Sequence, residues 1–364
     1  MILKDLCSYL DSAIPLSFQE GYDNSGLQIG LPEKKISSAI ITVDVTEQVV
    51  EEAITKKCDV IISHHPLIFG SLKRLGGSDS TQRTIVKAIK NDIAIYSAHT
   101  NLDVISNGVS SKMAEKLNLL NIRVLSPLKN RLLKLVTFIP EASLDKVREA
   151  LFDAGAGVIG NYDRCAFAVK GTGSFRGNSL TDPYVGIKGK DHFEKEVRFE
   201  TILFSHLKGK VINALHKAHP YEEVAYDLYP LENENIEIGL GCVGELKKPL
   251  EEGKFLELIS KTFQAEGIRY SGASGKKIGR VALCGGAGIS LLNEAKASGA
   301  DAFVTSDIKY HNFFDAGDAI LLVDTGHYES EKFSTEILYE LIRKKFPTFA
   351  LRFSEINTNP INYL

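Results

Sequence analysis

The chain has 364 residues, of which 44% are hydrophobic and 24% are charged, which is enough for two or three structural units of a globular protein. Its 43 basic and 46 acidic residues leave a net charge of −3, which offers no general attraction to nucleic acid or to an anionic membrane. We find no signal-peptide pattern, no apolar run of transmembrane length and no C-x-x-C pair among the five cysteines, so we expect a cytoplasmic protein.

The first third of the chain alternates strand patterns with helix patterns. Continuous Val- and Ile-rich runs are typical of strands that are buried on both faces. Thr46 stands where it can cap the first of the helices between them. This alternation predicts an α/β core with a mainly parallel sheet. We expect strands at 38–45, 58–63 and 92–100, and helices at 46–57, 80–91 and 108–120.

The middle of the chain has a different order of elements: strand, helix, strand, strand, helix, strand. The two halves are similar in length and order, which is typical of a ferredoxin-like α+β unit. Its longest irregular connection is the Gly-rich segment 171–191. We expect the six elements at 132–140, 141–155, 165–175, 197–205, 206–220 and 222–231.

The α/β alternation returns in the last third, with strands expected at 278–286, 301–307, 318–326 and 348–356. The simplest organisation is one α/β core interrupted by an inserted ferredoxin-like α+β domain, because insertions are tolerated at exposed loops. The expected bounds are 1–130 for the first part of the core, 131–238 for the inserted domain and 239–364 for the second part.

Histidines and carboxylates follow several of the predicted strands. The chain has nine histidines, and five of them stand after strands of the core. Ligands of open α/β sheets bind at the carboxyl ends of the strands, so these residues are candidates for a common site. They are His64 and His65, then His99 and Asp103, then Asp307 and His311, and finally His327 and Glu331.

Two adjacent histidines at a strand end suit two neighbouring metal ions. Within a strand the two side chains would point to opposite faces, but beyond its end, with Pro66 fixing the turn, both can face one site. His327 and Glu331 share a face if a helix begins at His327. The alternatives are a solvent-facing or helix-capping His pair, a surface i,i+4 pair, and a turn role for Asp103.

We therefore predict a metal site made by His64, His65, Asp103, His327 and Glu331. Nitrogen and oxygen ligands without thiolate suit zinc, manganese, iron or cobalt. Five ligands exceed one closed tetrahedral site, so we expect two divalent metal ions per chain with a bridging carboxylate. His99 and His311 are candidate catalytic acid/base groups, or else polar core residues with satisfied hydrogen bonds.

Three further motifs each have two interpretations. The amides of "CGGAGIS" could hold a phosphate, although a tight strand-to-helix turn is the simpler interpretation. Asp23 and Asn24 could line the site or form a turn. In "AHPYEEV", His219, Glu222 and Glu223 could bind an ion, although a helix end followed by a strand explains the pattern more simply.

The segments "GYDNSGLQIG", "SHHPLIFG", "AHTNLD", "GGAG", "SDIKYH" and "DTGHYESE" together resemble the YqfO-like (Nif-three-like) family, the GTP cyclohydrolase 1 type 2 homologues. The middle region, with "AHPYEEVAYDLYPL", resembles the insert of the longer family members. The resemblance implies an α/β core split by a PII- or CutA-related domain, a toroidal homohexamer, and a dinuclear metal site on the same five residues.

The resemblance also implies a metal-dependent hydrolase acting on a nucleotide or a related phosphorylated compound. A cyclohydrolase reaction would begin by attack of water at C8 of the guanine of GTP, with His99 or His311 moving protons. The alternative is a metal-binding regulator or metal carrier without catalysis, which the PII-like insert suggests. DNA or protein binding without catalysis is a third hypothesis, and the near-neutral charge does not favour it. The expected partners are a small-molecule substrate and further copies of this chain, without nucleic acid or membrane.

Overall fold

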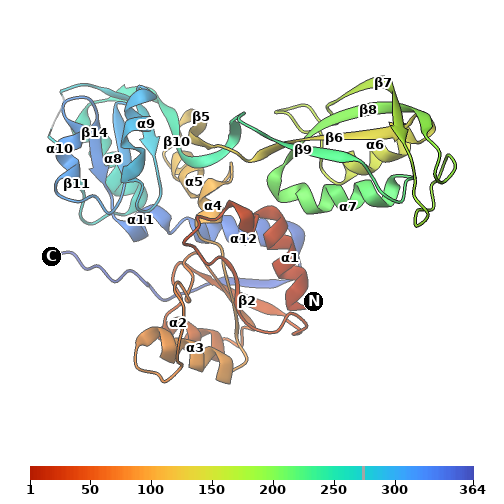
Figure 1. Cartoon of the computed structure of the whole chain (residues 1–364). Coiled ribbons are helices and arrows are strands. Elements are labelled where there is room, and N and C mark those ends of the chain that lie inside the picture. Colours follow the sequence, from red (N-terminus) through yellow and green to blue (C-terminus); the bar gives the residue numbers. More distant parts are fainter. Residues whose placement is uncertain (273–274) are drawn as a thin grey trace. The chain divides into compact units, whose positions relative to one another are not determined.

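The computed structural model describes residues 1–272 and 275–364, and at Ile236 the backbone only. The chain forms two compact units, Met1–Pro127 with Ile236–Leu364, and Leu128–Asn235 (Figure 1). Within the described ranges, no helix has both the length and the apolar character needed to cross a membrane.

The first unit contains two sheets, so our expectation of one mainly parallel sheet was wrong. The five-stranded sheet has the order β1-β4-β3-β2-β15 and is parallel except for β1. The six-stranded sheet has the order β11-β14-β13-β12-β10-β5, in which β12, β13 and β14 are parallel, β10 is antiparallel to β12, and β11 is antiparallel to β14. Apolar runs identify strands but not their neighbours. Here β15 pairs with β2 and β10 pairs with β12, so the two sets of parallel strands do not join.

The parallel strands β2, β3, β4, β13 and β14 have four or five residues each and are buried along their whole length. The strands of the two sheets are β1 (Gly26–Ile29), β2 (Ser38–Thr42), β3 (Val60–Ser63), β4 (Ala94–Ser97), β5 (Leu120–Leu128), β10 (Asn235–Leu250), β11 (Arg269–Tyr270), β12 (Ile278–Leu283), β13 (Ala302–Thr305), β14 (Leu321–Asp324) and β15 (Ala350–Phe353).

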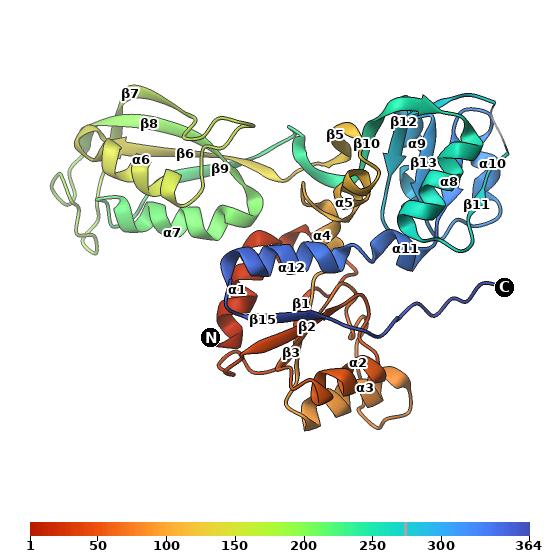
Figure 2. The same cartoon turned by 180° about the vertical axis from the view of Figure 1, so that it is seen from behind.

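One apolar core joins both sheets of the first unit. It includes Ile62 of β3 and Val304 of β13, together with Leu6, Phe255 and Leu338 from the helices that cover them. The pairing of β15 with β2 brings the C-terminal part of the chain into the sheet of the N-terminal part (Figure 2). The helices are α1 (Leu3–Ala13), α2 (Glu47–Thr55), α3 (Ser80–Lys90), α4 (Thr100–Val104), α5 (Val109–Lys116), α8 (Glu252–Phe263), α9 (Leu292–Ala297), α10 (Asn312–Ala316), α11 (His327–Glu331) and α12 (Ser334–Lys345).

The second unit has the element order β6-α6-β7-β8-α7-β9 and one antiparallel sheet with the strand order β7-β8-β6-β9. This is the βαββαβ arrangement of a ferredoxin-like fold. Its two helices pack together over the core that includes Leu135, Phe199 and Leu215. The elements are β6 (Leu132–Pro140), α6 (Leu144–Asp153), β7 (Ala166–Phe175), β8 (His192–Phe204), α7 (Lys208–Ala218) and β9 (Tyr226–Leu231).

Several local predictions are confirmed. The hydroxyl of Thr46 accepts the backbone N–H of Val49 and caps α2, as the N-cap position requires. The strand β6 has the predicted bounds, and a helix begins at His327. Among the elements that we did not predict are α1, α8 and the long strand β10.

Candidate metal centre

The candidate metal centre lies at the carboxyl ends of parallel strands from both sheets of the first unit. His64 follows β3 and His99 follows β4, while Asp307 follows β13 and His327 begins the helix after β14. Glu331, at the end of α11, lies one helical turn beyond His327 and shares its face. The two sheets therefore bring together residues that are more than 200 positions apart in the chain.

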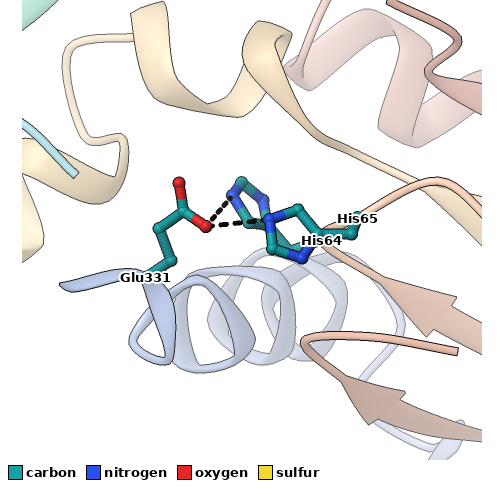
Figure 3. Close-up of side chains that lie close together, drawn as sticks. All are labelled: His64, His65 and Glu331. Carbon is teal, nitrogen blue, oxygen red and sulfur yellow. Dashed lines mark hydrogen bonds and ion pairs between the residues drawn. The ribbon is translucent and has the colours of Figure 1, made fainter. Parts of the chain in front are cut away.

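Glu331 lies at the centre of the cluster. Its Oε2 atom is 2.8 Å from Nε2 of His65, 2.8 Å from Nε2 of His327 and 3.7 Å from Nε2 of His64. Figure 3 shows the carboxylate facing both adjacent histidine rings. Across the described residues, His64, His65 and Glu331 are the one group of at least three His, Cys, Asp or Glu residues whose ligand atoms all lie within 4.8 Å of one another.

The outer nitrogen of each imidazole in the cluster is held by an oxygen atom. Nδ1 of His64 lies 2.8 Å from the carbonyl oxygen of Ala98. Nδ1 of His65 lies 2.7 Å from Oδ1 of Asp44, and Nδ1 of His327 lies 2.8 Å from Oδ2 of Asp307. Such bonds orient metal-binding imidazoles and direct Nε2 toward the ion.

Two buried polar atoms of the cluster have no hydrogen-bond partner among the described residues: Nε2 of His64 and Oδ1 of Asp103, which are 3.8 Å apart. An unpaired buried polar atom costs about 1–3 kcal/mol, and a bound cation is a partner that suits both atoms. The residues present therefore fit a divalent metal ion.

The charges within the cluster shift several pKa values. Burial lowers the pKa of His65, but its bonds with Asp44 and Glu331 outweigh burial and raise the pKa to about 9. Burial is also outweighed at His327, whose pKa rises to about 11 beside Asp307 and Glu331. Burial would raise the pKa of Glu331, but the imidazoles hold it well below its usual range. The raised pKa values favour protonated imidazoles beside the carboxylates, and a metal ion that bound here would have to displace those protons.

Glycine at position 286 makes room for Glu331. Gly286 has φ +63°, and a Cβ atom there would overlap Oε1 of Glu331. The amide of Gly286 donates to Oγ of Ser330 at 2.9 Å, and the amide of Gly288 donates to Oγ1 of Thr305 at 2.9 Å. These two amides of the "CGGAGIS" segment are bonded to side chains, which favours the tight-turn interpretation over a phosphate loop.

The two candidate acid/base histidines lie in different surroundings. His99 adjoins the cluster, with its ring centroid 5.4 Å from that of His64 and 5.3 Å from that of His65. Its Nδ1 lies 2.8 Å from Oδ1 of Asp23. His311 is exposed at the start of α10, its ring contacts Tyr310, and it has no hydrogen bond or ion pair with the cluster in the described part of the chain. A catalytic role for His311 stays a prediction without a supporting contact.

The ligand prediction did not include Asp44 or Asp307. Both follow strands, β2 and β13. Asp307 was among the strand-end candidates of the sequence, although not among the predicted ligands, whereas Asp44 was not among them. Asp44 was hidden because the apolar run continues through Val45, whereas β2 ends at Thr42. Asp307 has φ +56°, a conformation that Asp tolerates better than most residues.

The fold and this cluster define an α/β protein with a candidate metal centre. Residues 1–360 match the model of the Duf34/NIF3 (NGG1p interacting factor 3) family, and the chain belongs to this family. The resemblance inferred from the sequence motifs is thereby confirmed.

Known relatives cover almost the whole chain. A Bacillus subtilis (strain 168) protein named GTP cyclohydrolase 1 type 2 homolog is 40% identical over 359 residues, which are 96% of this chain and 95% of the relative. The crystal structure of a Bacillus cereus protein related to NIF3 has a TM-score of 0.86 at 40% identity and covers 100% of this chain and 99% of that chain. The Staphylococcus aureus protein SA1388 has a TM-score of 0.79 at 30% identity, with the same coverage.

Proposed function

We propose that this protein binds two divalent metal ions through His64, His65, Asp103, His327 and Glu331. The observation that carries the proposal is the position of Glu331 Oε2 among three imidazole Nε2 atoms, beside the unpaired atoms of His64 and Asp103. His64 with Asp103 would hold one ion and His65 with His327 the other, with Glu331 between them. Zinc, manganese, iron and cobalt suit this set of ligands.

We further propose that the centre performs metal-dependent hydrolysis. When bound, the ions supply a Lewis acid and lower the pKa of water. The ring of His99 is fixed by Asp23, which directs Nε2 away from that carboxylate and lets it exchange a proton with a substrate. His64 and Glu331 are buried, whereas the side chains of His65 and His327 are 23% and 33% exposed, so a substrate can reach this side of the cluster.

An aromatic pair supports a substrate with a planar ring. Phe69 lies 6.0 Å from the ring of His99, and Tyr22 lies 6.2 Å from Phe69. Both side chains are more than half exposed, so their faces are free to stack on a base. With the name of the Bacillus subtilis relative, this pair favours a nucleotide such as GTP or a related phosphorylated compound.

Elemental analysis of metal per chain tests the metal proposal. We expect about two ions in the wild type and a large loss in His65→Ala/Glu331→Ala. The control is His216→Ala/Glu232→Ala, which removes the same residue types from exposed positions of the second unit and should retain the metal. Wild-type protein that neither holds nor takes up metal would refute the proposal, provided that circular dichroism shows a folded chain.

Turnover of GTP by the metal-loaded protein tests the hydrolase proposal. His99→Gln should abolish turnover while the metal content stays unchanged. A regulator or carrier would instead be favoured by three results together. The metal would bind reversibly, nucleotides would not be turned over, and a partner protein would bind only the metal-loaded form. A homohexamer and a cytoplasmic location also remain proposals; sedimentation and cell fractionation test them.

A further inference from the structure

The second unit contains a cleft that the proposed metal centre does not use. Its volume is about 640 Å³, which is within the usual range for small-molecule sites. The cleft lies where β7, β8 and the connection between them meet the segment after α7. Both irregular segments of this unit, the Gly-rich connection and "AHPYEEV", contribute residues to the cleft, and the metal centre does not explain their function.

Aromatic side chains supply walls of the cleft. The ring of Tyr221 lies 5.9 Å from that of Phe175, at 61°, and 6.3 Å from that of Tyr184, at 50°. Phe138 also lines the cleft. Phe175, Tyr184 and Tyr221 all line the cleft, and aromatic side chains grouped around one space favour an organic cation.

The charged residues of the cleft differ in their ion pairs. Each lining cation has an acidic partner: Lys170 with Glu141 at 3.1 Å, Arg198 with Glu200 at 2.8 Å, and Arg176 with Asp191 at 3.8 Å. The lining carboxylates have no ion pair with any described residue: Glu196, Glu222 and Glu223. The cleft therefore has unneutralised negative charge beside its aromatic walls.

Glu196 is the most buried of these carboxylates, with 8% of its surface exposed. Its Oε1 accepts the hydroxyl of Tyr221 at 2.9 Å. Burial and this carboxylate raise the pKa of Tyr221, so the phenol stays protonated. Gly173 on β7 leaves the space that the carboxylate occupies, because a Cβ atom there would overlap Oε2 of Glu196.

The "AHPYEEV" segment does not act as an ion site through His219. Nε2 of His219 donates to the carbonyl of Phe138 at 3.0 Å, and Nδ1 accepts the amide of Tyr221 at 3.1 Å. Both nitrogens are thus bonded to the backbone and fix the segment that carries Tyr221. The carboxylates of the cleft form no metal-ligand group, since the group described above is the one found across residues 1–272 and 275–364. The cleft therefore suits an organic cation and not a bare metal ion.

We propose that this cleft binds a small molecule carrying an ammonium group, with the cation against the rings of Phe175, Tyr184 and Tyr221 and with Glu196 as its counter-charge. The site is separate from the metal centre, and the proposal does not depend on the hydrolase function.

Binding of three probes to the full chain tests this proposal: benzyltrimethylammonium, benzyl alcohol and phenylacetate, measured by ligand-observed NMR. We expect the cation to bind at least about tenfold more tightly than the neutral and anionic probes, a difference of about 1.4 kcal/mol. Glu196→Gln keeps the shape of the side chain and should weaken binding of the cation about tenfold. Tyr184 is 61% exposed, so Tyr184→Ala should not affect folding. It should weaken binding of the cation about threefold.

The matched control is Glu232→Gln, which removes one exposed negative charge of the same unit outside the cleft and should leave binding unchanged. Equal binding of the cation to wild type and to both Glu196→Gln and Tyr184→Ala would overturn the proposal. The proposal would also be overturned if phenylacetate bound more tightly than the cation and Tyr184→Ala weakened the binding of phenylacetate. If Glu196→Gln fails to fold, Tyr184→Ala alone decides between these outcomes.

Discussion

Oδ1 of Asp44 lies 2.7 Å from Nδ1 of His65, on the opposite side of the ring from Glu331. The second oxygen of Asp44 accepts the hydroxyl of Thr358 at 2.7 Å. Thr358, near the C-terminus, thus holds the carboxylate of Asp44, and Asp44 in turn holds the ring of His65. The direction in which Nε2 of His65 points depends on this chain of bonds.

Replacing Asp44 by Asn should weaken metal binding about 10- to 100-fold, because the ligand ring loses the carboxylate that orients it and increases its basicity. Titration calorimetry with Zn²⁺ or competition against a chelator measures this affinity. Asp227→Asn, at an exposed position of the second unit, should leave it unchanged. Equal affinities of Asp44→Asn and wild type would show that the bond does not position the ligand.

Replacing Gly286 by Ala should destabilise the chain by more than about 1 kcal/mol, because Ala is strained at positive φ. It should also remove bound metal, since a Cβ atom there would displace Glu331. Gly253→Ala is the matched control: it lies at an open, exposed position of α8 and should stabilise the chain by about 0.5–1 kcal/mol. Urea unfolding and metal analysis measure both effects, and a Gly286→Ala chain with full metal content would contradict the geometry.

Asp23 should make stability depend on pH on the acid side. Burial would raise its pKa, but bonds from His99 and Thr100 hold the pKa below its usual range. Because the folded pKa is below the unfolded value of about 3.9, the stabilisation is complete above that value and is lost as the pH falls through the folded pKa.

Asp23→Asn should therefore reduce the free energy of unfolding at neutral pH by about 1–3 kcal/mol. It should also lose less stability than wild type between about pH 6 and about pH 3. Urea unfolding at both pH values checks this. Parallel losses in the two proteins would mean that Asp23 does not contribute to the acid sensitivity.

Tyr22 and Phe69 should contribute to nucleotide binding through stacking. Removing either ring by Tyr22→Ala or Phe69→Ala should weaken GTP binding by about 1–3 kcal/mol. Inorganic triphosphate has no ring, so its affinity should be the same in both variants and in wild type. If the affinities for GTP and for inorganic triphosphate fell equally, the effect would come from contacts with the phosphates or from a local change in structure, and not from stacking.

Much of the local structure was predictable because it depends on neighbours in the sequence. Thr46 caps α2 by a bond to a residue three positions away, and the bounds of β6 follow from its mainly apolar composition. The strand-end pattern singled out His64, His65, His99, Asp103, Asp307, His311, His327 and Glu331 for the same reason: a polar residue after a buried strand is visible in a short window of sequence.

The sequence by itself indicated most of the strands, the polar residues that follow several of them and the family motifs. Only the tertiary structure decided that the core has two sheets, that Asp44 and Asp307 hold the rings of His65 and His327, and that Gly286 leaves room for Glu331. His65 and Glu331 are 266 residues apart. Contacts of that kind depend on which strands become neighbours, and the free energy of that choice comes from packing across the whole core, which no local pattern contains.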